Sequence, residues 1–100
     1  MPNTETMIKP KLNLQEPPMF KVIYVNDNKT TVSFVVDSVV NYFNYAVTTA
    51  EKIADTIHTD GSAIVAVLPF EIAEQKGIEV TVAARSQGFP LQVKIEKEEA

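Results

Sequence analysis

Three segments of the chain show the residue pattern of β-strands. Phe20, Val22 and Tyr24 alternate with residues that are themselves mostly apolar, which predicts a first strand with both faces partly covered. Residues 62–68 form an apolar run that is too short for an ordinary helix and is rich in Val and Ile, which predicts a buried strand. Residues 91–96 alternate between apolar and polar side chains, which predicts a half-buried third strand.

Two further segments show the spacing of helices. Between residues 32 and 43, apolar side chains recur at steps of three and one, the spacing of one helix face, although the many β-branched residues lower the helix propensity. Thr48 and Glu51 match a capping box with Thr48 as the N-cap, and the apolar spacing after it predicts a second helix to about Thr59. The dipeptide Asp60-Gly61 should end this helix.

A third helix completes the expected fold. It should begin at Pro69, which suits a first helical turn, and end before Gly88, while Gly77 in its interior should cost about 1 kcal/mol relative to Ala. The predicted order is strand, helix, helix, strand, helix, strand. Three strands cannot bury two faces in so small a chain, so we expect an α+β fold. It would be a two-layer sandwich in which a three-stranded antiparallel sheet packs against three helices on one side.

The first residues differ in pattern from the rest of the chain. Residues 1–17 are polar, contain three prolines and follow neither period, so we interpret them as a flexible N-terminal extension and residues 18–97 as the folded domain. The apolar runs are far shorter than the roughly 18 to 20 residues that span a bilayer, and the amino terminus lacks an apolar signal core. We therefore expect a cytoplasmic protein without a membrane partner.

Composition narrows the possible chemistry. The 100 residues are 45% hydrophobic and 22% charged, which is ordinary for a small globular domain. The absence of cysteine and the single histidine exclude disulfides, thiol nucleophiles and imidazole-rich metal sites, and we expect no metal or cofactor. A net charge of -4 without a cluster of Lys or Arg argues against nucleic acid as a partner. These features favour a binding module over an enzyme.

Polar side chains are concentrated between the first strand and the first helix. Residues 26–31 are all polar, which is more than a turn requires, and they begin with Asn26, Asp27 and Asn28. These side chains could simply bond neighbouring amides and cap the helix, or they could form a cage of acceptors for a cation such as an ammonium group. The cage would need a second wall, and it has too few oxygens for a calcium loop.

The single histidine, His58, is the other candidate for chemistry. Helical spacing places it at the edge of an apolar face, near the carboxyl end of the second helix. A histidine at this position is more often a capping or surface group than a ligand or base, because the helix dipole favours a cation there.

Several short motifs along the chain form a pattern that is known from one protein family. The first is Pro17-Pro18-Met19-Phe20-Lys21-Val22-Ile23-Tyr24-Val25-Asn26-Asp27, followed by Thr30 and Phe34-Val35. Further matches are Tyr42-Phe43, Ala50, Ile57-His58, Gly61, Glu71-Ile72-Ala73-Glu74-Gln75-Lys76, Ala84-Arg85 and Pro90-Leu91. With these residues the sequence resembles the ClpS adaptor family over roughly residues 16–96. This resemblance implies a non-catalytic adaptor that binds the free amino-terminal residue of an N-degron substrate, a bulky Leu, Phe, Tyr or Trp, and delivers it to a Clp AAA+ protease.

The resemblance also implies roles for individual residues. The α-amino group would be bound by Asn26, Asp27, Asn28 and His58, with Asp27 supplying negative charge directly or through water. Thr30 would contact the first peptide unit, while Val32, Ala54, Ile57 and Leu91 would line the pocket for the first side chain. Glu71 and Lys76 would face the amino-terminal domain of a ClpA-type or ClpC-type ATPase, and residues 1–17 would correspond to the extension presented to the ATPase pore.

Four positions depart from the commonest family pattern. Asn28 replaces a second acid, which drops a formal charge, and Thr31 replaces a proline, which makes the turn less rigid. Val32 and Ala54 stand where methionines are frequent, so they remove flexible bulk and should change the shape of the pocket. We expect the ligand still to be a bulky hydrophobic residue, with an altered ranking among Leu, Phe, Tyr and Trp.

Three alternatives to N-degron delivery stay open at this point. The chain could dock on the Clp ATPase and modulate its substrate choice without binding N-degrons. An enzyme would need His58 and Asp27 as an acid–base pair, and the sequence offers no accompanying nucleophile or metal set. A structural domain is the third alternative, because the carboxyl-terminal domain of the ribosomal stalk protein is similar in fold to the ClpS family. In each case we expect a monomer.

Overall fold

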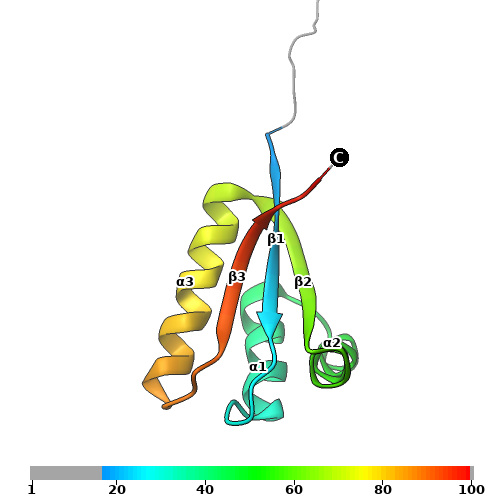
Figure 1. Cartoon of the computed structure of the whole chain (residues 1–100), viewed down its shortest axis with the longest axis vertical. Coiled ribbons are helices and arrows are strands. Elements are labelled where there is room, and N and C mark those ends of the chain that lie inside the picture. The colour runs from blue at the N-terminus through cyan, green and yellow to red at the C-terminus, as the bar shows by residue number, and fades with distance from the viewer. Residues whose placement is uncertain (1–16, 100) are drawn as a thin grey trace, which may run out of the picture.

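The structure, a computed structural model, describes residues 17–99 and contains the predicted elements in the predicted order (Figure 1). The elements are β1 (Met19–Val25), α1 (Val32–Phe43), α2 (Val47–Asp60), β2 (Ser62–Pro69), α3 (Phe70–Ser86) and β3 (Gln92–Lys97). The strands form one antiparallel sheet in the order β2-β1-β3, so the first strand of the chain lies at its centre. The predicted α+β fold is therefore confirmed.

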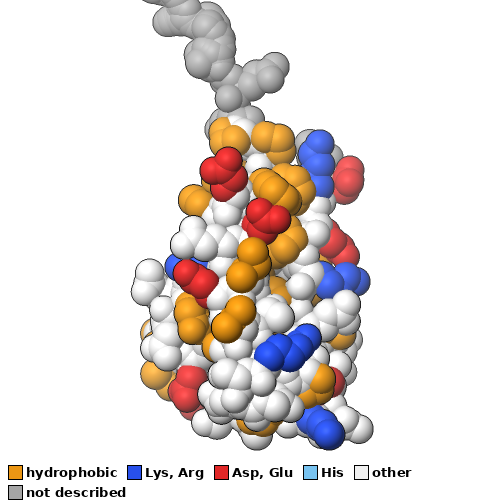
Figure 2. Space-filling view, turned by 90° about the vertical axis from the view of Figure 1, so that its left-hand side faces the viewer, with side chains coloured by type: hydrophobic (Ala, Val, Ile, Leu, Met, Phe, Trp, Pro, Cys, Tyr) orange, Lys and Arg blue, Asp and Glu red, His pale blue; other side chains and the backbone are white. Residues whose placement is uncertain are grey.

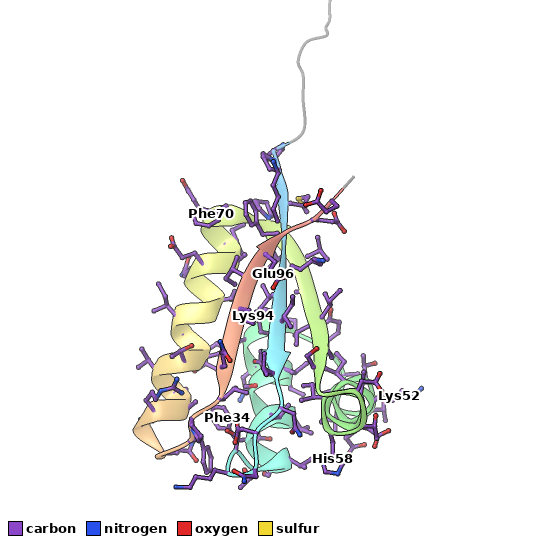
Figure 3. The ribbon with its side chains drawn as sticks, viewed as in Figure 1. Phe34, Lys52, His58, Phe70, Lys94 and Glu96 are labelled. Carbon is purple, nitrogen blue, oxygen red and sulfur yellow. The ribbon has the colours of Figure 1, made fainter. Side chains whose placement is uncertain are left out.

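The sheet has one covered face and one open face. Val22 and Tyr24 of β1 are fully buried on the covered face, behind which α1 lies in Figure 1. Lys94 and Glu96 of β3 are exposed on the other face, toward the viewer of Figure 3, and their side chains form an ion pair at 3.3 Å. The period-two pattern of the sequence thus corresponds to a two-layer arrangement.

Local signals place the helix ends, with corrections at the starts of two helices. Helix α3 begins at Phe70, and Pro69 is its N-cap and the last residue of β2. The Thr31 hydroxyl accepts the Phe34 N–H at 3.1 Å and caps α1. Thr48 is not the N-cap of α2: Ala46 occupies that position, and its carbonyl accepts the Ala50 N–H at 2.9 Å. The capping-box prediction was wrong, because only a short link with an extended Ala46 separates α1 from α2. Thr48 therefore already lies within the helix.

Tyr45, in the link between α1 and α2, also explains an irregularity of the sheet. The register of β1 against β2 shifts so that Val22 pairs with Ala66 but Ile23 pairs with Ile64, which leaves Val65 as the extra residue of a bulge. The Tyr45 hydroxyl donates to the Val65 carbonyl at 2.6 Å. This hydrogen bond gives a bulged carbonyl a partner and ties the link to the sheet.

Gly77 has a packing role that its helix propensity does not suggest. It is buried in α3 against β3, and a Cβ atom there would lie 3.3 Å from Ile95 Cδ1 and 3.7 Å from Val93 Cγ1. The missing side chain lets the helix approach the strand closely. The loss of propensity predicted from the sequence is therefore offset by contact between α3 and the sheet.

The predicted extension, residues 1–17, lies outside the described residues except for Pro17, which is exposed. The division into this extension and a domain at residues 18–97 thus stays a prediction, and β3 ends at Lys97. In the part of the chain that the structure describes, no helix is both long enough and apolar enough to cross a membrane.

One buried polar pair crosses from the sheet to α1. The Tyr24 hydroxyl lies 2.8 Å from Ser38 Oγ, and Ser38 itself donates to the Val35 carbonyl at 2.9 Å, so Tyr24 is the donor in the first bond. Burial raises the pKa of Tyr24 from 10.0 to about 12, against the smaller lowering effect of the Ser38 hydrogen bond. The neutral phenol is the form that the fold stabilises.

We expect Tyr24→Phe to lower the free energy of unfolding by about 1 kcal/mol at pH 7, because Ser38 loses its partner in the core. A folded-state pKa of about 12 against 10.0 means that the neutral phenol stabilises the fold fully below pH 10 and that this contribution is lost as the pH rises toward 12. Urea unfolding of the wild type and the variant at several pH values measures both effects. A variant that loses stability above pH 10 as steeply as the wild type would contradict the assignment.

Candidate functional site

The polar turn between β1 and α1 is organised around one carboxylate. Asp27 Oδ1 accepts the backbone N–H groups of Lys29 and Thr30, both at 2.7 Å. Asp27 Oδ2 accepts the Thr30 hydroxyl, also at 2.7 Å. The structural interpretation of this turn is thus correct for Asp27, whose two oxygens both hold the turn, while the capping of α1 falls to Thr31.

Asp27 is held in its charged form. Burial would raise its pKa, but the hydrogen bonds from Thr30 and Lys29 and the positive charge of Arg85 outweigh that effect and lower the pKa below its ordinary value. A fixed negative charge therefore lies within the turn at neutral pH.

The same geometry decides how Thr30 can interact with a ligand. An ionised carboxylate can only accept, so the Thr30 hydroxyl proton must point at Asp27. The oxygen of Thr30 then presents only lone pairs to its surroundings. Thr30 can accept an N–H group of a ligand, whereas it has no proton left to donate to a carbonyl.

The turn is joined to the carboxyl end of α2. The Asn26 N–H donates to the Gly61 carbonyl at 2.9 Å, and the Gly61 N–H donates to the Ile57 carbonyl at 3.0 Å. Gly61 ends α2 with φ 92°, a left-handed conformation that glycine adopts without strain. His58, exposed in the last turn of α2, lies at the same end of the molecule as the turn (Figure 3). The structure thus brings the predicted polar residues to one end of the sheet.

The predicted pocket residues divide into two groups. Ala54, Ile57 and Leu91 are buried in the common hydrophobic core, with exposures of 5% or less. Val32, at the start of α1, is 62% exposed. The structure therefore places three of the four predicted pocket residues in the core, and it leaves Val32 at the surface.

Sequence reasoning missed the role of one residue near the turn. Arg85 Nη1 donates to the carbonyls of Phe89 and Leu91, both at 2.9 Å, and its charge acts on Asp27. Phe89 packs edge-on against Phe34 of α1, with ring centroids 5.4 Å apart. A basic residue in the last turn of a helix commonly binds nearby carbonyls, and this signal was present in the sequence.

The predicted docking residues lie on α3, away from the turn. Glu71 is exposed in the first turn of α3. Lys76 lies further along the helix, where its Nζ atom is 3.9 Å from Glu79 Oε1. Figure 2 looks onto this side of the molecule and shows hydrophobic side chains with acidic side chains between them. The exposed large hydrophobic residues of α3 are Phe70, Ile72, Ile78 and Val82.

Within residues 17–99, no three His, Asp or Glu side chains come close enough to hold a metal ion. Fold and site together define a small α+β domain that gathers a fixed carboxylate, amide groups and an imidazole at one end of its sheet.

The comparisons with known proteins agree on one family. The family model described as ATP-dependent Clp protease adaptor protein ClpS matches residues 15–94. The ATP-dependent Clp protease adapter protein ClpS of Campylobacter jejuni strain 81-176 is 41% identical over 98 residues, which cover 98% of this chain and all of that protein. The protein of the same name from Clostridium acetobutylicum is 40% identical over 86 residues, which cover 86% of this chain and 85% of that one.

A solved structure supports the same assignment. The structure of Agrobacterium tumefaciens ClpS2 bound to L-phenylalaninamide superposes with a TM-score of 0.80 at 35% identity, and it covers 83% of this chain and all of that one. The chain therefore belongs to the ClpS family of ATP-dependent Clp protease adaptor proteins. Membership in this family implies a Clp ATPase as a partner.

We expect Asp27→Asn to destabilise the turn and to lower the free energy of unfolding by about 1 kcal/mol at pH 7. Because the folded-state pKa of Asp27 is lowered, its contribution is present above the unfolded value of about 3.9 and is lost as the pH falls through the folded value. The difference in the free energy of unfolding between wild type and variant should shrink below about pH 4. Urea unfolding from pH 2.5 to 7 tests this, with the exposed Asp37→Asn as the control. A difference that is independent of pH would show that the charge is unimportant.

Proposed function

We propose that this adaptor binds the free amino terminus of substrate polypeptides that begin with a bulky hydrophobic residue and delivers them to a Clp AAA+ protease. The observation that carries the proposal is the junction of the β1–α1 turn with the end of α2. It brings the Asn26–Asn28 segment to the end of the molecule that carries His58. Similarity to a ClpS2 protein whose structure contains L-phenylalaninamide supports an amino-terminal ligand.

The chemistry of the turn suits an ammonium group. Asn26 and His58 would accept from the α-amino group, and the charge of Asp27 would act directly or through water. Hydrogen bonds that involve a charged partner are roughly twice as strong as neutral ones. Thr30, which can only accept, would take the N–H of the first peptide unit. Asn28 adds an exposed amide in place of a second charge. An acetylated amino terminus would leave these acceptors without a charged donor.

The side-chain specificity depends on the apolar cluster. Ala54, Ile57 and Leu91 would form the floor of the pocket, and Val32 would close over the bound side chain from the surface. Val32 and Ala54 have less bulk than the methionines that are frequent at these positions in the family, which would change the shape of the pocket and so the ranking among Leu, Phe, Tyr and Trp. The adaptor acts by binding alone, with His58 as a hydrogen-bonding partner rather than a base.

Fluorescence anisotropy with short peptides tests this proposal. We expect peptides that begin with free Leu, Phe, Tyr or Trp to bind at least about tenfold more tightly than those that begin with Ala or Gly. Acetylation of the amino terminus should abolish binding because it removes the charge of the α-amino group. His58→Ala should abolish binding because it removes an acceptor for that group.

The matched control is Thr56→Ala, on the exposed side of the same helix, which should bind as the wild type does. Equal affinity for all first residues would contradict the pocket, and binding that survives acetylation would contradict the ammonium site. Absence of binding by any free amino terminus would favour the alternative function, in which the protein docks on the ATPase without reading N-degrons.

The ATPase would dock on α3. Its four exposed hydrophobic side chains lie on the same helix as Glu71 and Lys76, so both apolar and charged groups are available along α3. Phe70 also packs edge-on against Phe20 of β1, with ring centroids 5.0 Å apart, which fixes this end of the helix to the sheet. The amino-terminal domain of the ATPase is the proposed occupant.

We expect Lys76→Glu to weaken binding to an isolated amino-terminal domain of a Clp ATPase by about tenfold, because it reverses one charge of the proposed contact. Isothermal titration calorimetry measures this. Lys52→Glu makes the same change on α2, far from α3 (Figure 3), and should leave the affinity unaltered. If Lys52→Glu has the larger effect, the docking surface lies elsewhere.

A further inference from the structure

Arg85 is the only arginine of the chain, and its hydrogen bonds hold the loop that follows α3. It lies in the last turn of α3 and is tied to the following loop by both its backbone and its side chain. The Arg85 carbonyl accepts the Gly88 N–H at 3.0 Å. The guanidinium reaches further along the loop, to the carbonyls of Phe89 and Leu91 at 2.9 Å each.

Those two carbonyls belong to residues with clear packing roles. The side chain of Leu91 is 1% exposed and belongs to the core cluster together with Ala54 and Ile57. The ring of Phe89 contacts Phe34 in the first turn of α1, directly after the polar turn. A clamp on these carbonyls therefore fixes the loop against both the apolar cluster and the amino end of α1.

The charge of Arg85 also acts on the turn between β1 and α1. It is one of the influences that lower the pKa of Asp27, so the guanidinium lies near enough to the turn to favour the carboxylate. One side chain thus contacts the loop that carries Leu91 and adds a positive field at the turn. Arginine suits this role, because its planar group offers several donors in a fixed geometry and stays charged.

We propose that Arg85 is a positioning residue for amino-terminal recognition: by holding the carbonyls of Phe89 and Leu91, it sets the place of Leu91 relative to the β1–α1 turn and so the shape of the side-chain pocket. This inference rests on the proposed function. Arg85 acts through Leu91 and Phe89 and does not itself touch the ligand.

The test compares Arg85→Met, which keeps the length of the side chain but removes charge and donors, with Arg85→Lys, which keeps the charge and fewer donors. Peptides with free amino-terminal Leu and Phe are the probes. We expect Arg85→Met to weaken the binding of both peptides by about tenfold. It should also change the ratio of their two dissociation constants by about threefold or more. Arg85→Lys should recover part of both effects.

The ratio separates positioning from general loss of structure. Circular dichroism and thermal unfolding first establish the temperature at which each variant is fully folded, and binding is measured below it. A purely structural role would leave the ratio of Leu to Phe affinity unchanged, and that result would overturn the inference, as would wild-type affinities in Arg85→Met. If the wild type binds no free amino terminus, the proposed function fails first and this inference fails with it.

Discussion

The hydrogen bond from the Asn26 N–H to the Gly61 carbonyl is the contact on which the site depends. It joins the end of the central strand to the end of α2, so a polar turn and a histidine-bearing helix end share one side of the molecule. Neither segment could be oriented by its neighbours in sequence alone. Gly61 serves both sides of the junction, because its left-handed conformation ends α2 while its carbonyl receives the bond from β1.

Around this junction, polar groups have structural tasks that also determine their chemistry. Asp27 holds the turn by accepting three hydrogen bonds, and the same bonds keep it ionised. Thr30 helps to hold Asp27 and is left as an acceptor. The structural and the functional interpretations of the turn are therefore compatible, because the hydrogen bonds that shape the turn also keep Asp27 ionised. The proposed ammonium site would take its second wall from the end of α2, which the Asn26–Gly61 hydrogen bond joins to the turn.

The adaptor's two proposed contacts lie in different regions of a small domain. Amino-terminal recognition would use one end of the sheet, while ATPase docking would use the outward side of α3. Arg85 lies in the last turn of α3 and binds the loop that carries Leu91, so the same helix borders both regions. Gly77, in the middle of α3, lets this helix lie close to β3 and fixes the distance between the two layers.

The sequence by itself determined the element order, because period-two and helical spacing report directly on which faces are buried, as at Val22 and Tyr24. It also marked Asn26–Asn28 and His58 as the only unusual polar chemistry, and the family resemblance assigned them roles. The bulge at Val65 and the close approach at Gly77 were decided by tertiary contacts, since each depends on a partner far along the chain. The N-cap at Ala46 and the clamp formed by Arg85 have partners only four to six residues away. Only the folded chain brings the Asp27 turn, the end of α2 and the loop before β3 together.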